Sequence, residues 1–289
     1  MKPDISVIIP AHNEVLAVGI VVKEVAQVLR QNKYSFEILV VDDGSTDKTP
    51  QAAQKAGATV ITRLTRGGAG AARKTGLRRT KGEIIVMLDA DGSYDPKTIP
   101  QMLKLFPVYD QVNGARDSEK GTYPYLRQPT KWFIRTLASY LSGVKIPDLN
   151  TGLKAFKRKE MLKFLWVIPN GFSCVSTMTL AFLSNGYNVT WIPTVYRKRI
   201  GQSKFHPFHD TLSYLTTVIR IIMYFNPLKI FAPIAISLFI IGLATTIRHF
   251  TAYRLIRESD IIIFVTALVT LNIGLLADLI VAQGKKDSF

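Results

Sequence analysis

The feature that most restricts the fold of this chain is a pair of long apolar runs in its last quarter. Residues 228–247 carry one charged side chain, Lys229 at the edge, and residues 261–281 carry only Asp278. Because an α-helix rises about 1.5 Å per residue, some 20 residues cover the roughly 30 Å hydrocarbon layer of a membrane. The segment between the runs is short and polar. We therefore predict a hairpin of two transmembrane helices, with spans at about 228–247 and 261–281.

This hairpin would return the chain to the side of the membrane from which it entered. The first apolar run, residues 5–11, is too short for a cleavable signal and is followed at once by Asn13 and Glu14. Basic residues are somewhat more frequent beside the two outer ends of the hairpin than in its loop, which agrees with a cytosolic location of both ends. We expect an integral membrane protein whose large N-terminal part lies on the cytosolic face.

The charge balance indicates anionic partners. The chain has 37 Lys and Arg residues against 21 Asp and Glu residues, a formal charge of +16, and most of this excess precedes the apolar runs. Lipid head groups, phosphates and nucleic acid are the candidate partners. Basic and aromatic residues gather next to the predicted spans, which favours lipid over nucleic acid. The single cysteine, Cys174, excludes an internal disulfide and a cysteine-rich zinc site.

The part of the chain before the hairpin alternates between strand and helix patterns. Short β-branched runs are followed by segments in which apolar residues recur at helical spacing, and this alternation predicts a mostly parallel sheet with helices on both faces. We expect Ser45 or Thr46 to cap the second helix. The predicted strands are 5–9, 36–41, 58–62, 83–88 and 111–115, and the predicted helices are 15–29, 45–56 and 68–79.

Three of these strands are followed by polar, acid-bearing loops, at 11–14, 42–47 and 89–92. Ligands of parallel sheets bind at the carboxyl ends of the strands, so the three loops should meet at one edge. Asp89 and Asp91 are separated by one small residue at a strand end. Two carboxylates so placed can bind Mg²⁺ or Mn²⁺ while leaving coordination positions for phosphate oxygens. Such a metal would offset the charge that develops on a departing nucleoside diphosphate.

Together these loops carry a family resemblance. With Pro-Ala-His-Asn-Glu at 10–14, Val-Asp-Asp-Gly-Ser-Thr-Asp at 41–47 and Leu-Asp-Ala-Asp-Gly at 88–92, the chain resembles glycosyltransferase family 2. Within that family it is most similar to the polyprenyl-phosphate glycosyltransferases, the group of dolichol-phosphate mannose synthase. The likeness continues through Asp-Leu-Asn-Thr-Gly-Leu-Lys-Ala-Phe at 148–156, Arg-Ile-Gly-Gln-Ser-Lys at 199–204 and the two spans, and so covers nearly the whole chain.

The resemblance implies a GT-A fold, which is Rossmann-like, and a set of site residues. Asp89 and Asp91 would be the catalytic carboxylates and would hold the metal. The nucleotide would be bound by Pro10, Ala11, Asn13, Glu14, Asp42, Asp43, Arg73 and Asp89. The candidates for the acceptor phosphate are Arg116, Arg127, Lys131, Thr151, Arg199, Ser203 and Lys204.

The chain departs from the family pattern at two positions. Ser93 stands where an amide is frequent, and Ala69 stands where the glycine-rich stretch 66–73 usually carries lysine. Arg66 or Arg73 would then supply the lost cation. The small residues of this stretch are equally well explained by close packing of a helix against the sheet.

We thus predict a membrane-bound inverting glycosyltransferase that moves a sugar from a UDP- or GDP-linked donor to polyprenyl phosphate. Its parts would be a GT-A catalytic domain (1–205), a juxtamembrane interfacial helix (206–227) and the hairpin with its tail (228–289). Another basic, aromatic segment at 123–140 is also expected to lie in the interface. The alternative is a non-catalytic, membrane-tethered nucleotide-binding subunit. The sequence leaves open the sugar, the nucleotide, the polyprenyl chain and the oligomeric state, including a homo-oligomer.

Overall fold

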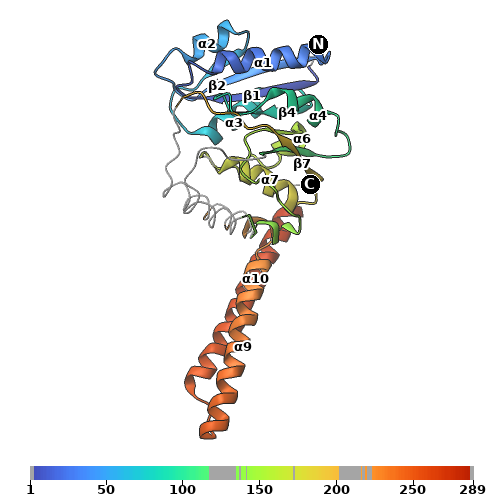
Figure 1. The fold of residues 1–289 in the computed structure, drawn as a ribbon. Helices are drawn as coiled ribbons and strands as arrows, with labels where there is room; N and C mark the ends of the chain where they lie inside the picture. Colours follow the sequence, from blue (N-terminus) through green and yellow to red (C-terminus); the bar gives the residue numbers. More distant parts are fainter. Residues whose placement is uncertain are drawn as a thin grey trace. The chain divides into compact units, whose positions relative to one another are not determined.

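The computed structural model divides the chain into two compact units, Met1–Val218 and Ile219–Phe289 (Figure 1). The first unit contains the sheet, and the second contains the two long apolar helices. Each unit is described by itself. The structure describes residues 3–116, 135–136, 138–140, 142–171, 173–201, 216, 219 and 223–286.

The first unit is built on a seven-stranded sheet with the order β3-β2-β1-β4-β6-β5-β7. Strands β1 to β4 run parallel to one another, and β5 and β7 share their direction. Strand β6 is antiparallel to both of its neighbours, β4 and β5. The predicted mostly parallel sheet is therefore confirmed, with one reversed strand in it. The strands are β1 (Ile5–Ala11), β2 (Phe36–Asp42), β3 (Thr59–Thr62), β4 (Ile84–Met87), β5 (Gln111–Arg116), β6 (Lys154–Lys157) and β7 (Val189–Thr194).

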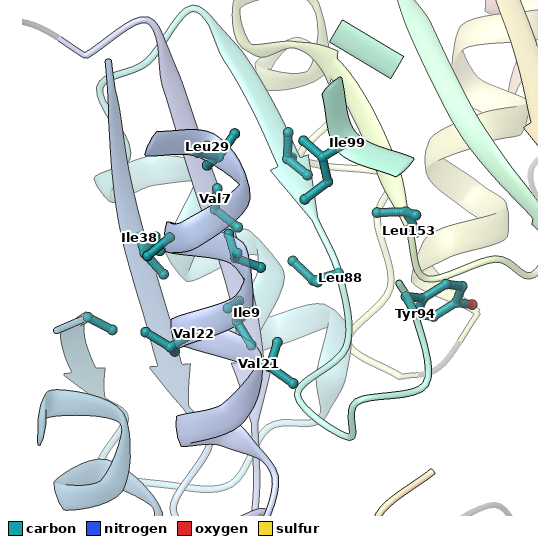
Figure 2. Close-up of a cluster of buried hydrophobic side chains, with 14 of the residues drawn as sticks. Val7, Ile9, Val21, Val22, Leu29, Ile38, Leu88, Tyr94, Ile99 and Leu153 are labelled. Carbon is teal, nitrogen blue, oxygen red and sulfur yellow. The ribbon is translucent and has the colours of Figure 1, made fainter. Parts of the chain in front are cut away.

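Helices cover both faces of this sheet. On one face, Val7 and Ile9 of β1 pack in a buried apolar cluster with Val21 and Leu29 of α1 (Figure 2). On the other face, the intervening Ile8 lies against α3, where its Cγ2 atom is 2.6 Å from the position that a Cβ on Gly76 would take. The helices of this unit are α1 (Val18–Gln31), α2 (Thr49–Lys55), α3 (Ala69–Arg79), the 3-10 turn η1 (Pro96–Thr98), α4 (Ile99–Leu103), α6 (Arg158–Leu162) and α7 (Cys174–Ser184).

The start of α2 differs from the prediction. Neither Ser45 nor Thr46 caps it, because the helix begins only at Thr49, one residue before a proline. Pro50 then lies in the first turn, where the N–H group that proline lacks would have no partner within the helix. The Ser45 hydroxyl instead accepts a hydrogen bond from the backbone N–H of Asn13 at 2.9 Å, which ties the second polar loop to the first.

The second unit is a helical hairpin. Helices α9 (Leu228–Tyr253) and α10 (Glu258–Lys286) are both long and apolar enough to cross a membrane. They pack antiparallel: Gly242 faces Ile263 at one level, and Gly274 faces Phe231 at another. At the turn, the buried carboxylate of Asp260 accepts hydrogen bonds from the backbone N–H of Arg257 (3.1 Å) and is paired with His249 Nδ1 (2.9 Å). These bonds fix the short connection between the two helices.

Candidate functional site

The loop after β4 holds the central carboxylate of the site. Asp91 Oδ1 accepts hydrogen bonds from the backbone N–H and the hydroxyl of Ser93, at 3.0 and 2.6 Å. Its other oxygen, Oδ2, is 2.5 Å from Arg199 Nη2. Gly92, which lies between Asp91 and Ser93 in the chain, has φ +73°. Glycine adopts this conformation without strain, and it turns the loop back on itself. Ser93 therefore orients Asp91, a role that its short side chain suits.

Asp89, the second carboxylate, is held from the other side by Arg73 of α3. Arg73 Nη2 lies 2.5 Å from Asp89 Oδ1, and its Nη1 donates to the thiol of Cys174 at 3.4 Å. The guanidinium is buried, with 4% of the Arg73 side chain exposed, whereas 36% of the Asp89 side chain is exposed. The structure thus places Arg73 behind Asp89, where it fixes the carboxylate. Contact of Arg73 with a nucleotide stays a prediction.

Asp89 also faces Gly152, which lies two residues before the reversed strand. The register of β4 with β6 pairs Met87 with Lys154, and continued by two residues it brings Gly152 opposite Asp89. A Cβ atom on Gly152 would lie 2.3 Å from Asp89 Oδ2. The backbone N–H of Gly152 donates to the hydroxyl of buried Tyr94 at 2.7 Å. Only glycine at this position leaves room for the carboxylate.

A third charged pair borders the site at the end of β5. Arg116 donates to both oxygens of Asp148, from Nε at 2.6 Å and from Nη2 at 2.9 Å. Burial by itself would raise the pKa of Asp148, but the hydrogen bonds and charge of Arg116 outweigh it and hold that pKa below its ordinary value. The indole of Trp191 donates to the backbone carbonyl of Asp148 at 2.9 Å. The Asp148 loop is therefore fixed on two sides.

The segment 196–201 runs along the acidic loop. Tyr196 forms a β-bridge with Tyr94, and the backbone N–H groups of Arg197 and Ile200 donate to the carbonyls of Ser93 and Asp91 at 2.7 and 2.9 Å. This pairing carries the Arg199 guanidinium to Asp91. Arg199 was predicted to bind the acceptor phosphate. The structure brings it to the site, and its phosphate contact stays a prediction.

The loops after β1 and β2 meet as predicted. Asn13 Oδ1 accepts from the backbone N–H of Thr46 at 2.8 Å, and the backbone N–H of Asp43 donates to the carbonyl of Ala11 at 2.8 Å. Ala11 and the preceding Pro10 are the last residues of β1. Glu14 lies on the same edge, with its Oε2 atom 3.9 Å from the position of a Cβ on Gly201. The third acidic loop is thereby connected to the first through the segment 196–201.

The two acids after β2 differ in their surroundings. Asp43 is occupied by protein donors: the backbone N–H groups of Gly67 and Gly68 at 3.0 and 2.6 Å, and Arg63 Nη1 at 2.8 Å. Asp42 is fully buried, and its Oδ1 atom has no hydrogen-bond partner among the described residues. Asp43 therefore organises the glycine-rich stretch, and Asp42 retains an oxygen that can accept a bond from a ligand.

The glycine-rich stretch is explained largely by packing. A Cβ on Gly70 would lie 2.0 Å from the carbonyl of Pro169, and Gly76 has the equally close contact with Ile8 described above. Arg66, at the start of the stretch, is exposed. The alternative reading of this sequence, that small residues let a helix approach the sheet, thus has direct support at these two positions.

Some predicted residues are not placed at the site. Arg127, Lys131, Ser203 and Lys204 lie outside the described residues. Thr151 is fully buried beside Gly152, its hydroxyl donates a long bond of 3.5 Å to the carbonyl of Leu153, and its contact with the acceptor phosphate stays a prediction. In turn, the sequence analysis missed Tyr94, Asp148 and Lys154. Asp148 and Lys154 belong to the motif at 148–156, but the linear pattern carries no signal for which of its side chains face the site.

The donor set fits a hard divalent cation. Asp89 and Asp91 supply carboxylate oxygens, which Mg²⁺ and Mn²⁺ prefer, and the partial exposure of Asp89 leaves access for phosphate and water ligands. No group of three or more His, Cys, Asp or Glu side chains with the arrangement of a metal site occurs among the described residues. The residues present therefore suit a shared ion that is completed by substrate oxygens.

Comparisons with known proteins place this site in a family. The chain is 31% identical to a dolichyl-phosphate hexose transferase of Haloferax volcanii, over 71% of this chain and 88% of that protein. It is also 31% identical to a polyprenol monophosphomannose synthase of Mycolicibacterium smegmatis, over 68% and 79% of the two chains. The crystal structure of glucosyl-3-phosphoglycerate synthase from Mycobacterium tuberculosis, in complex with Mn²⁺, UDP and phosphoglyceric acid, has a TM-score of 0.63. At 20% identity it covers 76% of this chain and 78% of its own, and it supports the fold.

Two family models cover most of the sequence. The model of glycosyl transferase family 2 matches residues 6–172, which include all three acidic loops and Gly152. The model of the GtrB C-terminal hairpin matches residues 226–282, which span α9 and most of α10. The chain is a glycosyltransferase that belongs to family 2 and carries a C-terminal hairpin of the GtrB type.

Proposed function

We propose that this protein transfers a sugar from a nucleotide donor to a polyprenyl phosphate at the cytosolic face of a membrane. One observation carries the proposal: the pair Asp89 and Asp91, at the strand edge where nucleotides bind in such sheets, occurs in one chain with a hairpin suited to a membrane. Relatives whose names state a dolichyl-phosphate or polyprenol-phosphate product support the choice of acceptor.

The donor would lie across the three acidic loops. Asp42, whose buried Oδ1 atom has no partner among the described residues, would accept a hydrogen bond from a base N–H or a ribose hydroxyl when the nucleotide binds. Asp89 and Asp91 would hold Mg²⁺ or Mn²⁺. When bound, that ion supplies Lewis-acid stabilisation of the charge on the departing diphosphate. The Mn²⁺ and UDP in the solved glucosyl-3-phosphoglycerate synthase support this arrangement by analogy of fold.

The acceptor explains why the site needs no strong base. A phosphate monoester has a second pKa near 6 and is largely ionised at pH 7. Its oxygen can therefore attack the anomeric carbon directly, while the bond from that carbon to the donor diphosphate breaks. A single displacement of this kind inverts the anomeric configuration. Arg116 and Arg199 are the described residues that would contact this phosphate, and both are already held in place by carboxylates.

The experiment is an assay of the detergent-purified, full-length protein. It combines undecaprenyl or dolichyl phosphate, Mg²⁺ or Mn²⁺, and a panel of radiolabelled UDP- and GDP-sugars. We expect label in the lipid fraction from one donor, lost on addition of EDTA. Label released only as free sugar, or passed to a soluble phosphate ester in preference to the lipid, would contradict the acceptor. Nucleotide binding without any transfer would favour the tethered-subunit alternative.

Replacement of Arg116 by lysine should lower kcat/KM of this reaction by about 10- to 100-fold. Arginine donates to Asp148 through two parallel bonds, a geometry that the single ammonium of lysine does not reproduce, and hydrogen bonds between charged groups contribute about 1.5–3 kcal/mol. Arg30→Lys is the matched control, because Arg30 is exposed in the last turn of α1, at the edge of the sheet opposite the acidic loops. Equal activities of the two variants would show that the Arg116–Asp148 pair has no part in transfer.

A further inference from the structure

Lys154, on β6, is buried in a way that the transfer reaction described so far does not use. Its side chain is fully buried, and the ammonium donates to Thr179 Oγ1 at 2.7 Å and to Asn113 Oδ1 at 3.1 Å. Both acceptors are neutral. Among the described residues, no carboxylate lies within ion-pairing distance of it. A buried ammonium without a carboxylate partner is costly, so its presence calls for a reason other than stability.

The polar cluster around Lys154 contains more donors than acceptors. Gln111 Nε2 donates to the same two oxygens as Lys154, to Asn113 Oδ1 at 2.8 Å and to Thr179 Oγ1 at 2.9 Å. The Nδ2 donor of Asn113 is buried and has no partner among the described residues, and the same holds for the Oε1 acceptor of Gln111. Each of the two oxygens thus accepts from both Lys154 and Gln111, and neither oxygen carries a charge that would offset that of an ammonium group.

The charges that act on Lys154 belong to the transfer site. Lys154 pairs in register with Met87 of β4, two residues before Asp89, and with Asn113 of β5. Burial lowers the pKa of Lys154 to about 7; the attraction of Asp148 opposes this shift, and Arg73 and Arg116 add to it. On α7, the electrostatic effect of the Cys174 thiol also opposes the lowering of the Lys154 pKa.

The charge balance of the site indicates a role for Lys154 in offsetting the charge of the substrates. Three guanidinium groups are paired with three carboxylates, so the paired side chains carry no net charge. The proposed substrates bring a diphosphate and a phosphate monoester to this edge. An anion that arrives next to a buried lysine raises the affinity of that lysine for a proton. The three pairs are Arg73–Asp89, Arg116–Asp148 and Arg199–Asp91.

We propose that Lys154 is a positioning residue for the anionic substrates. When a nucleoside diphosphate binds, Lys154 takes up a proton from solvent, and its positive charge then offsets part of the negative charge of the diphosphate. This inference rests on the proposed function. It assigns the cluster of Lys154, Asn113, Gln111 and Thr179 to substrate binding as well as to packing. By linkage, nucleotide binding and protonation of Lys154 each strengthen the other.

Calorimetry at pH 8 tests the proposal. At this pH free Lys154 is mostly neutral and nucleotide phosphates, with a last pKa near 6, are fully ionised, so proton uptake reports on the protein. The full-length protein in detergent is titrated with UDP and with GDP, with Mg²⁺ present, in buffers of different ionisation enthalpy. We expect an uptake of about 0.3–0.8 proton per nucleotide bound, an estimate from the linkage relation. Lys154→Met should abolish the uptake and weaken binding about tenfold, and Lys154→Arg should restore affinity without uptake.

The outcomes separate the two proposals. Binding without proton uptake, or an uptake that persists in Lys154→Met, would overturn the role of Lys154 and leave the proposed function intact. Failure of both nucleotides to bind the wild-type protein would contradict the proposed function and this inference with it.

The stability of Lys154→Met supplies a readout that a purely structural lysine would not give. The pKa of Lys154 in the folded protein is below its ordinary value, so between about pH 7 and pH 10 the unfolded chain binds more protons and stability rises with pH. We expect Lys154→Met to raise the midpoint of thermal denaturation at pH 7 by several degrees and to remove this pH dependence. A lowered midpoint would indicate that the lysine serves packing alone.

Discussion

Asp91→Asn is expected to lower sugar transfer by about 10²- to 10³-fold while the protein remains folded. Asparagine has the shape of aspartate and can still accept the hydrogen bonds from Ser93 through its side-chain oxygen. It lacks the negative charge that a divalent cation requires, and loss of electrostatic stabilisation at a departing group costs about two to three orders of magnitude in rate. The measurement is initial rate of lipid labelling at saturating donor, in parallel with the thermal midpoint.

The control for this variant is Asp4→Asn. Asp4 is exposed and precedes β1, at the edge of the sheet opposite the acidic loops. It carries the same change of charge without a contact to the site. Mn²⁺ binding, followed by electron paramagnetic resonance, should be weakened in Asp91→Asn and unchanged in Asp4→Asn. Transfer by Asp91→Asn within tenfold of wild type would remove Asp91 from the catalytic machinery.

Gly152→Ala is expected to reduce kcat/KM by about 10²-fold. The added Cβ would lie 2.3 Å from Asp89 Oδ2, well inside contact distance, so the carboxylate must move. The buried guanidinium of Arg73 lies 2.5 Å from the other oxygen of Asp89, so few other conformations are open to the Asp89 side chain. Displacement of a reacting group by about 1 Å can cost two orders of magnitude.

The chain offers a matched control for that substitution in Gly171→Ala. A Cβ on Gly171 would meet no atom within 4 Å, and its backbone does not require glycine. We expect wild-type kinetics for Gly171→Ala and a donor KM that changes less than kcat for Gly152→Ala, because the contact affects Asp89 and not the base-binding loops. Wild-type activity of Gly152→Ala would mean that the loop relaxes and that Asp89 is not held where we infer.

The sequence predicts the first half of the sheet well, for a physical reason. Strands β1, β2 and β4 are largely buried on both faces, so β-branched and aliphatic residues predominate in each, and the predicted bounds agree with the observed ones within two residues. Each run ends where polar residues begin. Because parallel strands bring those ends together, Asn13, Asp42 and Asp89 could be assigned to one edge without a structure.

Strand β6 was not predicted as a strand. It has four residues, Lys154–Lys157, with a lysine at each end, and such a pattern is equally typical of an exposed helix start. It is a strand because two neighbours supply hydrogen bonds on both sides, and it is buried because those neighbours are central. Neither fact is local. The burial of Lys154 is a result of tertiary structure that overrides the ordinary preference of lysine for solvent.

The charge pairs of the site were also beyond the linear sequence. Arg73 was predicted to bind the nucleotide, and Arg116 and Arg199 were predicted to bind the acceptor phosphate. Each proves to be paired with a carboxylate: Arg73 with Asp89, Arg116 with Asp148, 32 residues away, and Arg199 with Asp91, 108 residues away. Spacing along the chain predicts which residues reach the edge, and only the fold determines which of them neutralise one another.

The position of β6 in the chain, after strands β1 to β5, also bears on how the protein folds during synthesis. Strands β1 to β4 are consecutive in the chain and pair with one another, so this half of the sheet can form on the ribosome before the rest has been synthesised. The glycine that faces Asp89 enters with β6, after residue 150, and the membrane hairpin follows later still. In the order of synthesis, the three acidic loops therefore come first, the contact of Gly152 with Asp89 second and the apolar hairpin last.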